Sequence, residues 1–162
     1  MDVVLLSTDG QAFQLQRRAA ELCVTLRPVL DDAQAEPFPM HMVASARLSR
    51  LVGLLHNIAR LPDVTREALH LGRVVAGALM LSTHYNLQTA IELLHDVKLL
   101  DCAEAHCLLA ARVAEMMNGK SVDELRTLLQ APDDLSEEEK ADALRESIAT
   151  REAQDIHQGP DE

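Results

Sequence analysis

Aromatic side chains are nearly absent from this chain of 162 residues, which has no Trp, one Tyr and two Phe. Leu, Val, Ala and Met must therefore build the core, and that composition favours helix. A domain of about 150 residues buries roughly 70% of its unfolded surface. The chain is thus long enough to fold as one compact domain without a disulfide or a metal.

Cysteines and long apolar runs are also scarce. The three cysteines, Cys23, Cys102 and Cys107, are odd in number and irregularly spaced, which does not indicate a disulfide framework. The N-terminus lacks the positive segment of a signal peptide, and no apolar run reaches the ~20 residues of a membrane helix. We expect a protein of the cytoplasm or the nucleus that does not span a membrane.

The chain has far fewer basic than acidic side chains. The 15 Lys and Arg oppose 26 Asp and Glu, and most of the net charge of −11 lies beyond residue 132. An acidic protein repels phosphate backbones and anionic lipids. We therefore expect neither a nucleic acid nor a membrane surface as a partner.

The N-terminal part of the sequence predicts a small sheet. Val3–Leu6 and Ala12–Leu15 flank Asp9-Gly10, one of the strongest signals for a β-hairpin. Residues 17–32 have helical composition interrupted by Pro28, so we expect a broken helix there. The two prolines within residues 35–40 allow only an extended segment, which could supply an edge strand.

Helices are predicted over most of the remaining sequence. Apolar residues at helical spacing predict helices over residues 44–61 and 69–81, and another over residues 87–97. Asp101 is expected to cap the next helix, which should end at Asn118-Gly119. Strands followed by a run of helices place the chain in the α+β class.

Two capping boxes indicate further helices near the C-terminus. Ser121 with Glu124, and Ser136 with Glu139, have the spacing at which a serine and a glutamate together cap a helix N-terminus. The first of these helices should be short, and the second should extend to about Arg151. The polar residues after it predict a disordered acidic tail.

No arrangement of residues indicates catalysis, a metal or a cofactor. Gly119-Lys120-Ser121 follows a helix and lacks the first glycine of a phosphate-binding loop, so helix caps account for it. Cys102 and His106 would share one helix face, but Cys107 would point away and no fourth ligand has the spacing of a zinc site. We therefore expect a protein that is not an enzyme and has no metal site.

The apolar residues of the short helix after Ser121 allow two interpretations. Leu125, Leu128 and Leu129 lie on a helix too short to be stable alone. They either complete the core of the domain or form a groove for the helices of another protein. Periodicity alone favours the core, which is the usual location of an apolar helical stripe.

Two blocks of sequence resemble the S-phase kinase-associated adaptors. Residues 113–126 (VAEMMNGKSVDELR) and 133–139 (DDLSEEE) are similar to V-A-N-M-I-K-G-K-T-P-E-E-I-R and N-D-F-T-E-E-E in that family. The segment Ser7-Thr8-Asp9-Gly10, with Phe13 after it, resembles the family's opening hairpin. The resemblance covers about residues 3–61 and 86–148.

This resemblance implies a BTB/POZ fold over residues 1–117, F-box-binding helices over residues 118–152 and the acidic tail over residues 153–162. It implies a non-catalytic adaptor that binds F-box proteins and links them to a cullin in an SCF-type ubiquitin ligase. BTB folds and an exposed F-box groove also allow a homodimer of the free chain. The residues implied to contact the F-box are Ile91, Leu94, Leu108, Val113, Met116, Leu125, Leu128, Leu129, Leu135 and Leu144.

The residues implied to face the cullin are Met40, His41, Met42, Lys98 and Leu99. The family has Asn-Tyr at the last two positions and Pro-Asn in place of His41-Met42. These departures predict weaker binding to a cullin. They also leave a second interpretation, a specialised paralogue that binds an F-box protein as a structural subunit of a cullin-independent assembly.

Overall fold

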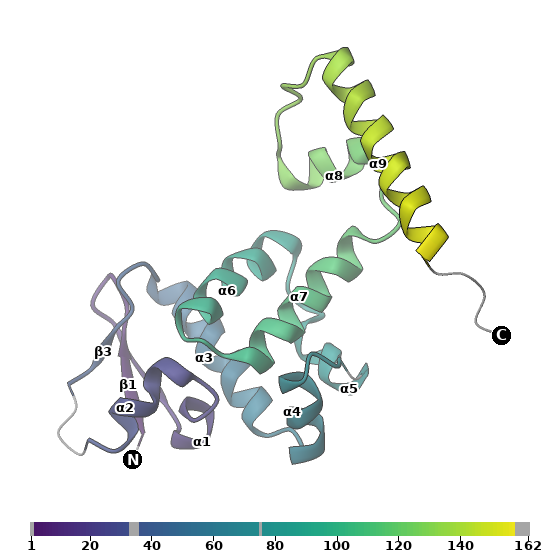
Figure 1. The fold of residues 1–162 in the computed structure, drawn as a ribbon. Helices are drawn as coiled ribbons and strands as arrows, with labels where there is room; N and C mark the ends of the chain where they lie inside the picture. Colours follow the sequence, from purple (N-terminus) through teal and green to yellow (C-terminus); the bar gives the residue numbers. More distant parts are fainter. Residues whose placement is uncertain (1, 33–35, 75, 158–162) are drawn as a thin grey trace. The chain divides into compact units, whose positions relative to one another are not determined.

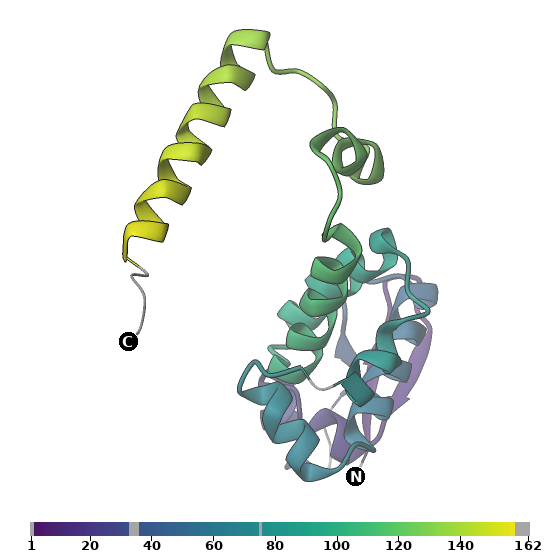
Figure 2. The same ribbon diagram turned by 90° about the vertical axis from the view of Figure 1, so that its right-hand side faces the viewer.

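A three-stranded sheet forms at the start of the chain. The computed structural model describes residues 2–32, 36–74 and 76–157 (Figures 1 and 2). β1 (Val3–Leu6) pairs antiparallel with β2 (Ala12–Leu15), and β3 (Phe38–Pro39) joins the other edge of β1 in parallel. The predicted hairpin and edge strand are confirmed, and residue 35 of the expected strand lies outside the described residues.

The turn between β1 and β2 also caps a helix that begins far along the chain. Gly10 has a φ of +80°, in the region that favours glycine. The Asp9 carboxylate accepts hydrogen bonds from the backbone N–H and the hydroxyl of Ser45, at 3.0 and 2.5 Å. Ser45 is the first residue of α3 (Ser45–Ala59), whose N-cap residue Ala44 has no side-chain acceptor. Asp9 therefore supplies the acceptor that α3 lacks in its own sequence.

This arrangement predicts how acid should act on the fold. Hydrogen bonds from Ser45 and Ser7 lower the pKa of Asp9 to about 2. A carboxyl with a lowered pKa stabilises the fold above its unfolded pKa of about 3.9, and loses that contribution as the pH falls toward 2. We expect Asp9→Ala to destabilise the protein at neutral pH and to match the wild type more closely near pH 2. Urea unfolding at a series of pH values measures the difference, and a difference independent of pH would contradict the prediction.

Three short helical segments follow the hairpin. They are α1 (Arg17–Ala20), the 3-10 helix η1 (Val24–Leu26) and α2 (Arg27–Leu30). The prediction of a broken helix is confirmed, but Pro28 lies in the first turn of α2 and so begins a segment instead of ending one. Its missing N–H is tolerated there because the first N–H groups of a helix have no intrahelical partner.

Longer helices enclose the core of this part of the chain. α6 (Leu87–Leu99) packs along α7 (Ala103–Met117), α4 (Asp63–His70) also packs on α7, and α3 contacts β2, α1, α6 and α7. The largest fully buried side chains include four leucines of α3, together with Leu93 and Leu108. The core is thus aliphatic, and the α+β class expected from the sequence is confirmed.

The single helix predicted over residues 69–81 is wrong. α4 ends at His70, and Gly72 turns the chain with a φ of +76°. α5 (Ala76–Leu79) and the 3-10 helix η2 (Met80–Ser82) follow as separate segments. Glycine adopts the left-handed conformation that ends a helix at no steric cost, and here that outweighs the apolar composition on both sides.

Asp101 does not cap α7 as predicted. It has a φ of +49°, and the N-cap residue is Cys102, which makes no side-chain cap bond. Asp101 instead turns the chain between α6 and α7, where its carbonyl accepts the backbone N–H of Val24 at 3.2 Å. An aspartate can adopt this conformation because its short polar side chain tolerates the left-handed region.

The chain divides into two units, Met1–Lys120 and Ser121–Glu162. The second unit contains α8 (Val122–Leu129) and α9 (Glu137–His157), and both predicted capping boxes are formed. α9 continues to His157 instead of ending near Arg151, so residues 153–157 of the predicted disordered tail are helical. No glycine or proline interrupts the sequence there. Residues 158–162 of the predicted tail lie outside the described residues.

Candidate protein-binding surfaces

The second unit exposes its apolar side chains. None of residues 121–148 is buried, and Leu125 is half-buried while Leu128, Leu129 and Leu135 are 39%, 43% and 45% exposed. The predicted contact residue Leu144 is 62% exposed on α9. The second unit therefore builds no buried core of its own from these leucines. A set of exposed leucines on helices is typical of a surface that binds another protein.

Caps and ion pairs define the conformation of this unit. The Ser121 backbone N–H donates to the Glu124 carboxylate at 2.7 Å, and Gln130 ends α8 with a φ of +54°. Asp133, in the connection to α9, lies 3.2 Å from Arg126 and 3.0 Å from Lys140. The hydrogen bond from Lys140 is the main reason that the pKa of Asp133 is lowered.

These polar contacts stabilise the second unit only weakly. Ion pairs at a protein surface typically contribute about 0–1 kcal/mol each, and a helix as short as α8 is marginal in water. No apolar side chain of residues 121–148 is fully buried, so the dominant stabilising term of a folded domain is small there. A partner that covers the leucines would supply it.

The predicted contact residues in the first unit are less accessible. Ile91 and Leu94 on α6 are half-buried, as are Val113 and Met116 near the end of α7. Leu108 is fully buried among the core residues and therefore cannot face a partner. Its position on α7 places it against the interior, together with Ala105 and Leu109, so its assignment to the surface is wrong.

The segment after β3 carries the first part of the predicted cullin-facing surface. His41 and Met42 are exposed, and Met42 is 75% exposed. Met40 is only 3% exposed, so the prediction that it faces a partner is wrong. Its backbone N–H donates to the Leu6 carbonyl at 2.8 Å, which continues the pairing of β3 with β1 and directs the side chain into the core.

A buried ion pair holds this segment against α6. The Arg47 guanidinium donates to the Met42 carbonyl at 2.6 Å and lies 2.8 Å from the Asp96 carboxylate. Asp96 is 1% exposed. Burial raises the pKa of Asp96, and the positive charge of Arg47 opposes that rise. Arg47 therefore connects the loop containing Met42 to α6 at Asp96, two residues before Lys98.

The end of α6 carries the second part of the predicted surface. Lys98 is exposed and Leu99 is 53% exposed. The Thr25 hydroxyl donates to the Leu99 carbonyl at 3.2 Å, and the Thr25 backbone N–H donates to the Leu100 carbonyl at 3.3 Å. These bonds hold the start of η1 against the end of α6, a contact that sequence reasoning missed because the two segments are far apart in the chain.

The described residues include buried thiols but no metal-binding cluster. Cys23 and Cys102 are buried free thiols, and the pKa of Cys23 is raised by its contact with Cys102 and by burial. The described residues contain no cluster of His, Cys, Asp and Glu that could hold a metal ion. Among their helices, none has the length and apolar character needed to cross a membrane.

The fold and the exposed helices define an α+β interaction protein with a helical C-terminal unit. The model of the Skp1 family, dimerisation domain, matches residues 106–149. SKP1-like protein 11 of Arabidopsis thaliana is 27% identical over 148 residues, covering 90% of this chain and 93% of that protein. SKP1-like protein 13 of the same plant is 28% identical over 151 residues, with 90% and 94% covered. The chain is similar to these SKP1-like proteins over most of its length, and its α+β fold is consistent with the BTB/POZ-like fold of the Skp1 family.

Proposed function

We propose that this chain is a non-catalytic adaptor of an SCF-type ubiquitin ligase. Its similarity to the Skp1 family supports that role, because proteins of this family act as adaptors and not as enzymes. The observation that carries the proposal is the second unit, which presents leucines on two capped helices and buries none of residues 121–148. The cytoplasm and the nucleus, expected from the sequence, are the compartments in which we propose that it acts.

The partner we propose for the second unit is the F-box of a substrate receptor. Each leucine that an F-box helix covers contributes about 1.5–3 kcal/mol when it is fully removed from water. The leucines of α8, with Leu135 and Leu144, would supply most of that energy. Capture of an F-box fragment by the tagged full-length chain tests the proposal directly. Without such a partner, the same exposed leucines support association of two copies of the chain.

The partner we propose for the loop at His41-Met42 and the end of α6 is a cullin, bound more weakly than in an ordinary family member. A lysine at position 98 presents a charge where the family has an amide, and burying an unpaired charge costs several kcal/mol. The second candidate function, a subunit of a cullin-independent assembly that binds an F-box protein, rests on the same two exposed side chains, Lys98 and Leu99.

Substitution of Lys98 and Leu99 should distinguish an adaptor that binds a cullin from a subunit of a cullin-independent assembly. We expect Lys98→Asn combined with Leu99→Tyr to raise the affinity for a cullin N-terminal domain about tenfold, because removing a 1.4 kcal/mol penalty has that effect. Both side chains are exposed, so the fold should tolerate the change. Calorimetry with an F-box fragment present provides the measurement, and Arg73→Gln provides a control that removes one exposed charge elsewhere. Tight binding by the wild type that the double substitution leaves unchanged would contradict the prediction.

A further inference from the structure

Two buried cysteines lie where the start of η1 meets the turn between α6 and α7. Cys23 precedes η1 and Cys102 precedes α7, each as the N-cap residue, and neither side chain makes a cap hydrogen bond. Their exposed fractions are 0% and 1%, and both are free thiols. Helix capping therefore does not account for either cysteine, and neither belongs to the surfaces proposed for an F-box or a cullin.

The backbone holds the two cysteines opposite each other. The Val24 N–H donates to the Asp101 carbonyl at 3.2 Å, and the next N–H along η1 donates to the carbonyl before it, so the two segments run in opposite directions. Cys23 and Cys102 flank this bond with extended backbones, at φ and ψ of −100° and 110° and of −107° and 99°. Residues placed in this way across an antiparallel pair have Cα atoms roughly 4.5 Å apart, within the span of roughly 4.4–6.8 Å that a disulfide bridges. The two side chains also touch, and this contact and burial raise the pKa of Cys23.

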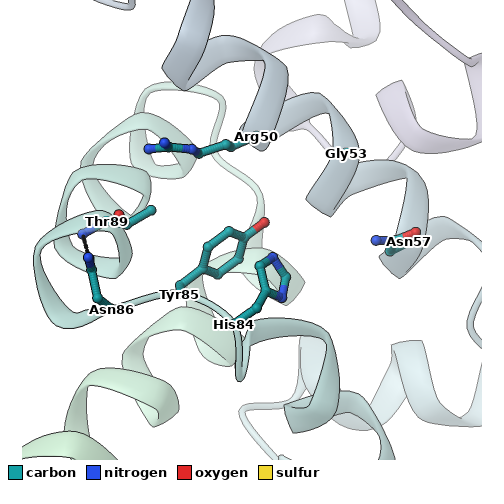
Figure 3. A pocket seen from close by; sticks show the side chains of 7 residues that line it. All are labelled: Arg50, Gly53, Asn57, His84, Tyr85, Asn86 and Thr89. Atoms are coloured by element: carbon teal, nitrogen blue, oxygen red, sulfur yellow. Dashed lines mark hydrogen bonds between the residues drawn. The ribbon is translucent and has the colours of Figure 1, made fainter.

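The cavities of the first unit differ in the chemistry of their linings. A polar pocket of about 420 Å³ lies between α3 and the segment before α6. Figure 3 shows its Arg50 and Asn57 side chains on opposite sides of the Tyr85 hydroxyl, so these polar groups do not converge on one ligand. A second cavity, of about 320 Å³ beside the turn between α6 and α7, is lined by Val97, Lys98, Asp101, Cys102, Ala103 and His106. This cavity borders a nucleophilic residue, and its volume admits a molecule that is only about twice the size of a water of roughly 30 Å³.

A proton acceptor lies next to Cys102. The sulfur of Cys102 is 3.9 Å from one carboxylate oxygen of Glu104, a residue that is 8% exposed. The other oxygen of that carboxylate lies 3.2 Å from Nδ1 of His70, whose side chain is 59% exposed. The thiolate, and not the thiol, is the nucleophilic form of cysteine. Glu104 can therefore take the proton that Cys102 must lose before its sulfur reacts.

We propose that Cys23 and Cys102 form a site of oxidation by hydrogen peroxide, which converts the two thiols into a disulfide. Cys102 attacks one peroxide oxygen as its proton passes to Glu104, the O–O bond breaks, and the leaving hydroxide takes that proton to become water. Cys23 then attacks the sulfur of the resulting sulfenic acid. The S–S bond forms as the S–O bond breaks, and the departing hydroxide takes the proton of Cys23 to form a second water. Two electrons pass from the two sulfurs to the peroxide, and the new bond joins η1 to the turn between α6 and α7.

Peptide mapping of the full-length chain after exposure to hydrogen peroxide is the first test. The remaining thiols are alkylated, and trypsin is combined with a glutamate-specific protease because cleavage after Glu104 separates Cys102 from Cys107. In the folded chain we expect peptides joined through Cys23 and Cys102, a mass lower by two hydrogen atoms before alkylation, and a free thiol at Cys107. In concentrated urea, the shorter loop between Cys102 and Cys107 should make that pair the main product.

Two variants identify the sulfur that reacts first. Cys107→Ala is the matched control, because Cys107 is half-buried and lies outside the pair, and it should form the same disulfide in the same yield. Cys23→Ala should form no disulfide, because the second thiol is missing. It should instead leave a sulfenic acid on Cys102, which dimedone traps as a stable adduct.

Thermal unfolding of the reduced and oxidised chain is the second measurement. Oxidation should raise the thermal midpoint by roughly 5–15 °C, because the disulfide closes a long loop in the unfolded chain. Cys107→Ala should show the same rise and Cys23→Ala none. Three free thiols after exposure, a disulfide through Cys107 in the folded chain, or a midpoint that oxidation lowers would each overturn the proposal. The peptide map of the wild type decides even where Cys23→Ala fails to fold.

Discussion

Replacing Leu125 and Leu129 by aspartate should lower the affinity of the full-length chain for an F-box fragment at least ~100-fold, a loss of about 2.8 kcal/mol or more. Both leucines lie on α8, where one is half-buried and the other is 43% exposed. A leucine that becomes buried at an interface contributes about 1.5–3 kcal/mol. Aspartate removes that contribution and adds the cost of desolvating a charge. The two substitutions together should therefore abolish capture.

Capture of the fragment by the tagged protein, followed by calorimetry, provides the measurement. The control is Val64→Asp, which places the same charge on an exposed apolar residue of α4 in the first unit. Val64 lies in the first turn of its helix, where an acidic residue is favourable, so this variant should fold and bind normally. Capture that survives the double substitution, or that Val64→Asp also abolishes, would contradict the assignment of the F-box to α8.

Elements defined by local chemistry were predictable from the sequence. Asp9-Gly10 predicted the hairpin because a tight turn requires residues that tolerate its conformation. The pairs Ser121–Glu124 and Ser136–Glu139 predicted two helix starts because both capping partners lie within one turn. In each case the residues that determine the structure are close together in the sequence, and the structure confirms them.

Elements defined by contacts between distant residues were not predictable. Met40 and Leu108 resembled surface residues of a related family, but the structure buries both. Their burial depends on β1 and on the packing of α6 and α4 against α7, which no local pattern reveals. The pocket around Tyr85 also brings together segments that are separate in the sequence. The candidate binding surface on α8 was anticipated from the resemblance to a known family, because periodicity alone favoured a core for its leucines.

The ion pair between Arg47 and Asp96 is the contact whose loss should destabilise the fold most. The Arg47 side chain is 30% exposed and the Asp96 side chain 2% exposed. Arg47→Met keeps the apolar stem but leaves the Asp96 carboxylate buried without its cation, a change that typically costs about 3–5 kcal/mol. Because Arg47 is partly solvated, we expect a loss near the lower end, about 3 kcal/mol in the free energy of unfolding. Arg66→Met, whose partner Asp63 is 82% exposed, is the control and should cost less than about 1 kcal/mol.

The pH dependence and the double substitution distinguish this electrostatic effect from lost packing. Burial raises the pKa of Asp96, so the folded protein binds more protons than the unfolded chain at pH values just above the unfolded pKa of about 3.9. The free energy of unfolding contributed by this group therefore falls as the pH rises through that window. Removing Arg47 raises the pKa of Asp96 further, so the loss of unfolding free energy in Arg47→Met should be largest at neutral pH and smaller in acid.

Adding Asp96→Leu to Arg47→Met should recover most of the stability, because an apolar pair of similar size often replaces a buried ion pair without loss. Urea unfolding of the wild type and both variants at pH 7 and pH 4 measures these differences in unfolding free energy. A deficit that is equal at both pH values and persists in the double variant would mean that Arg47 acts through its packing instead of its charge.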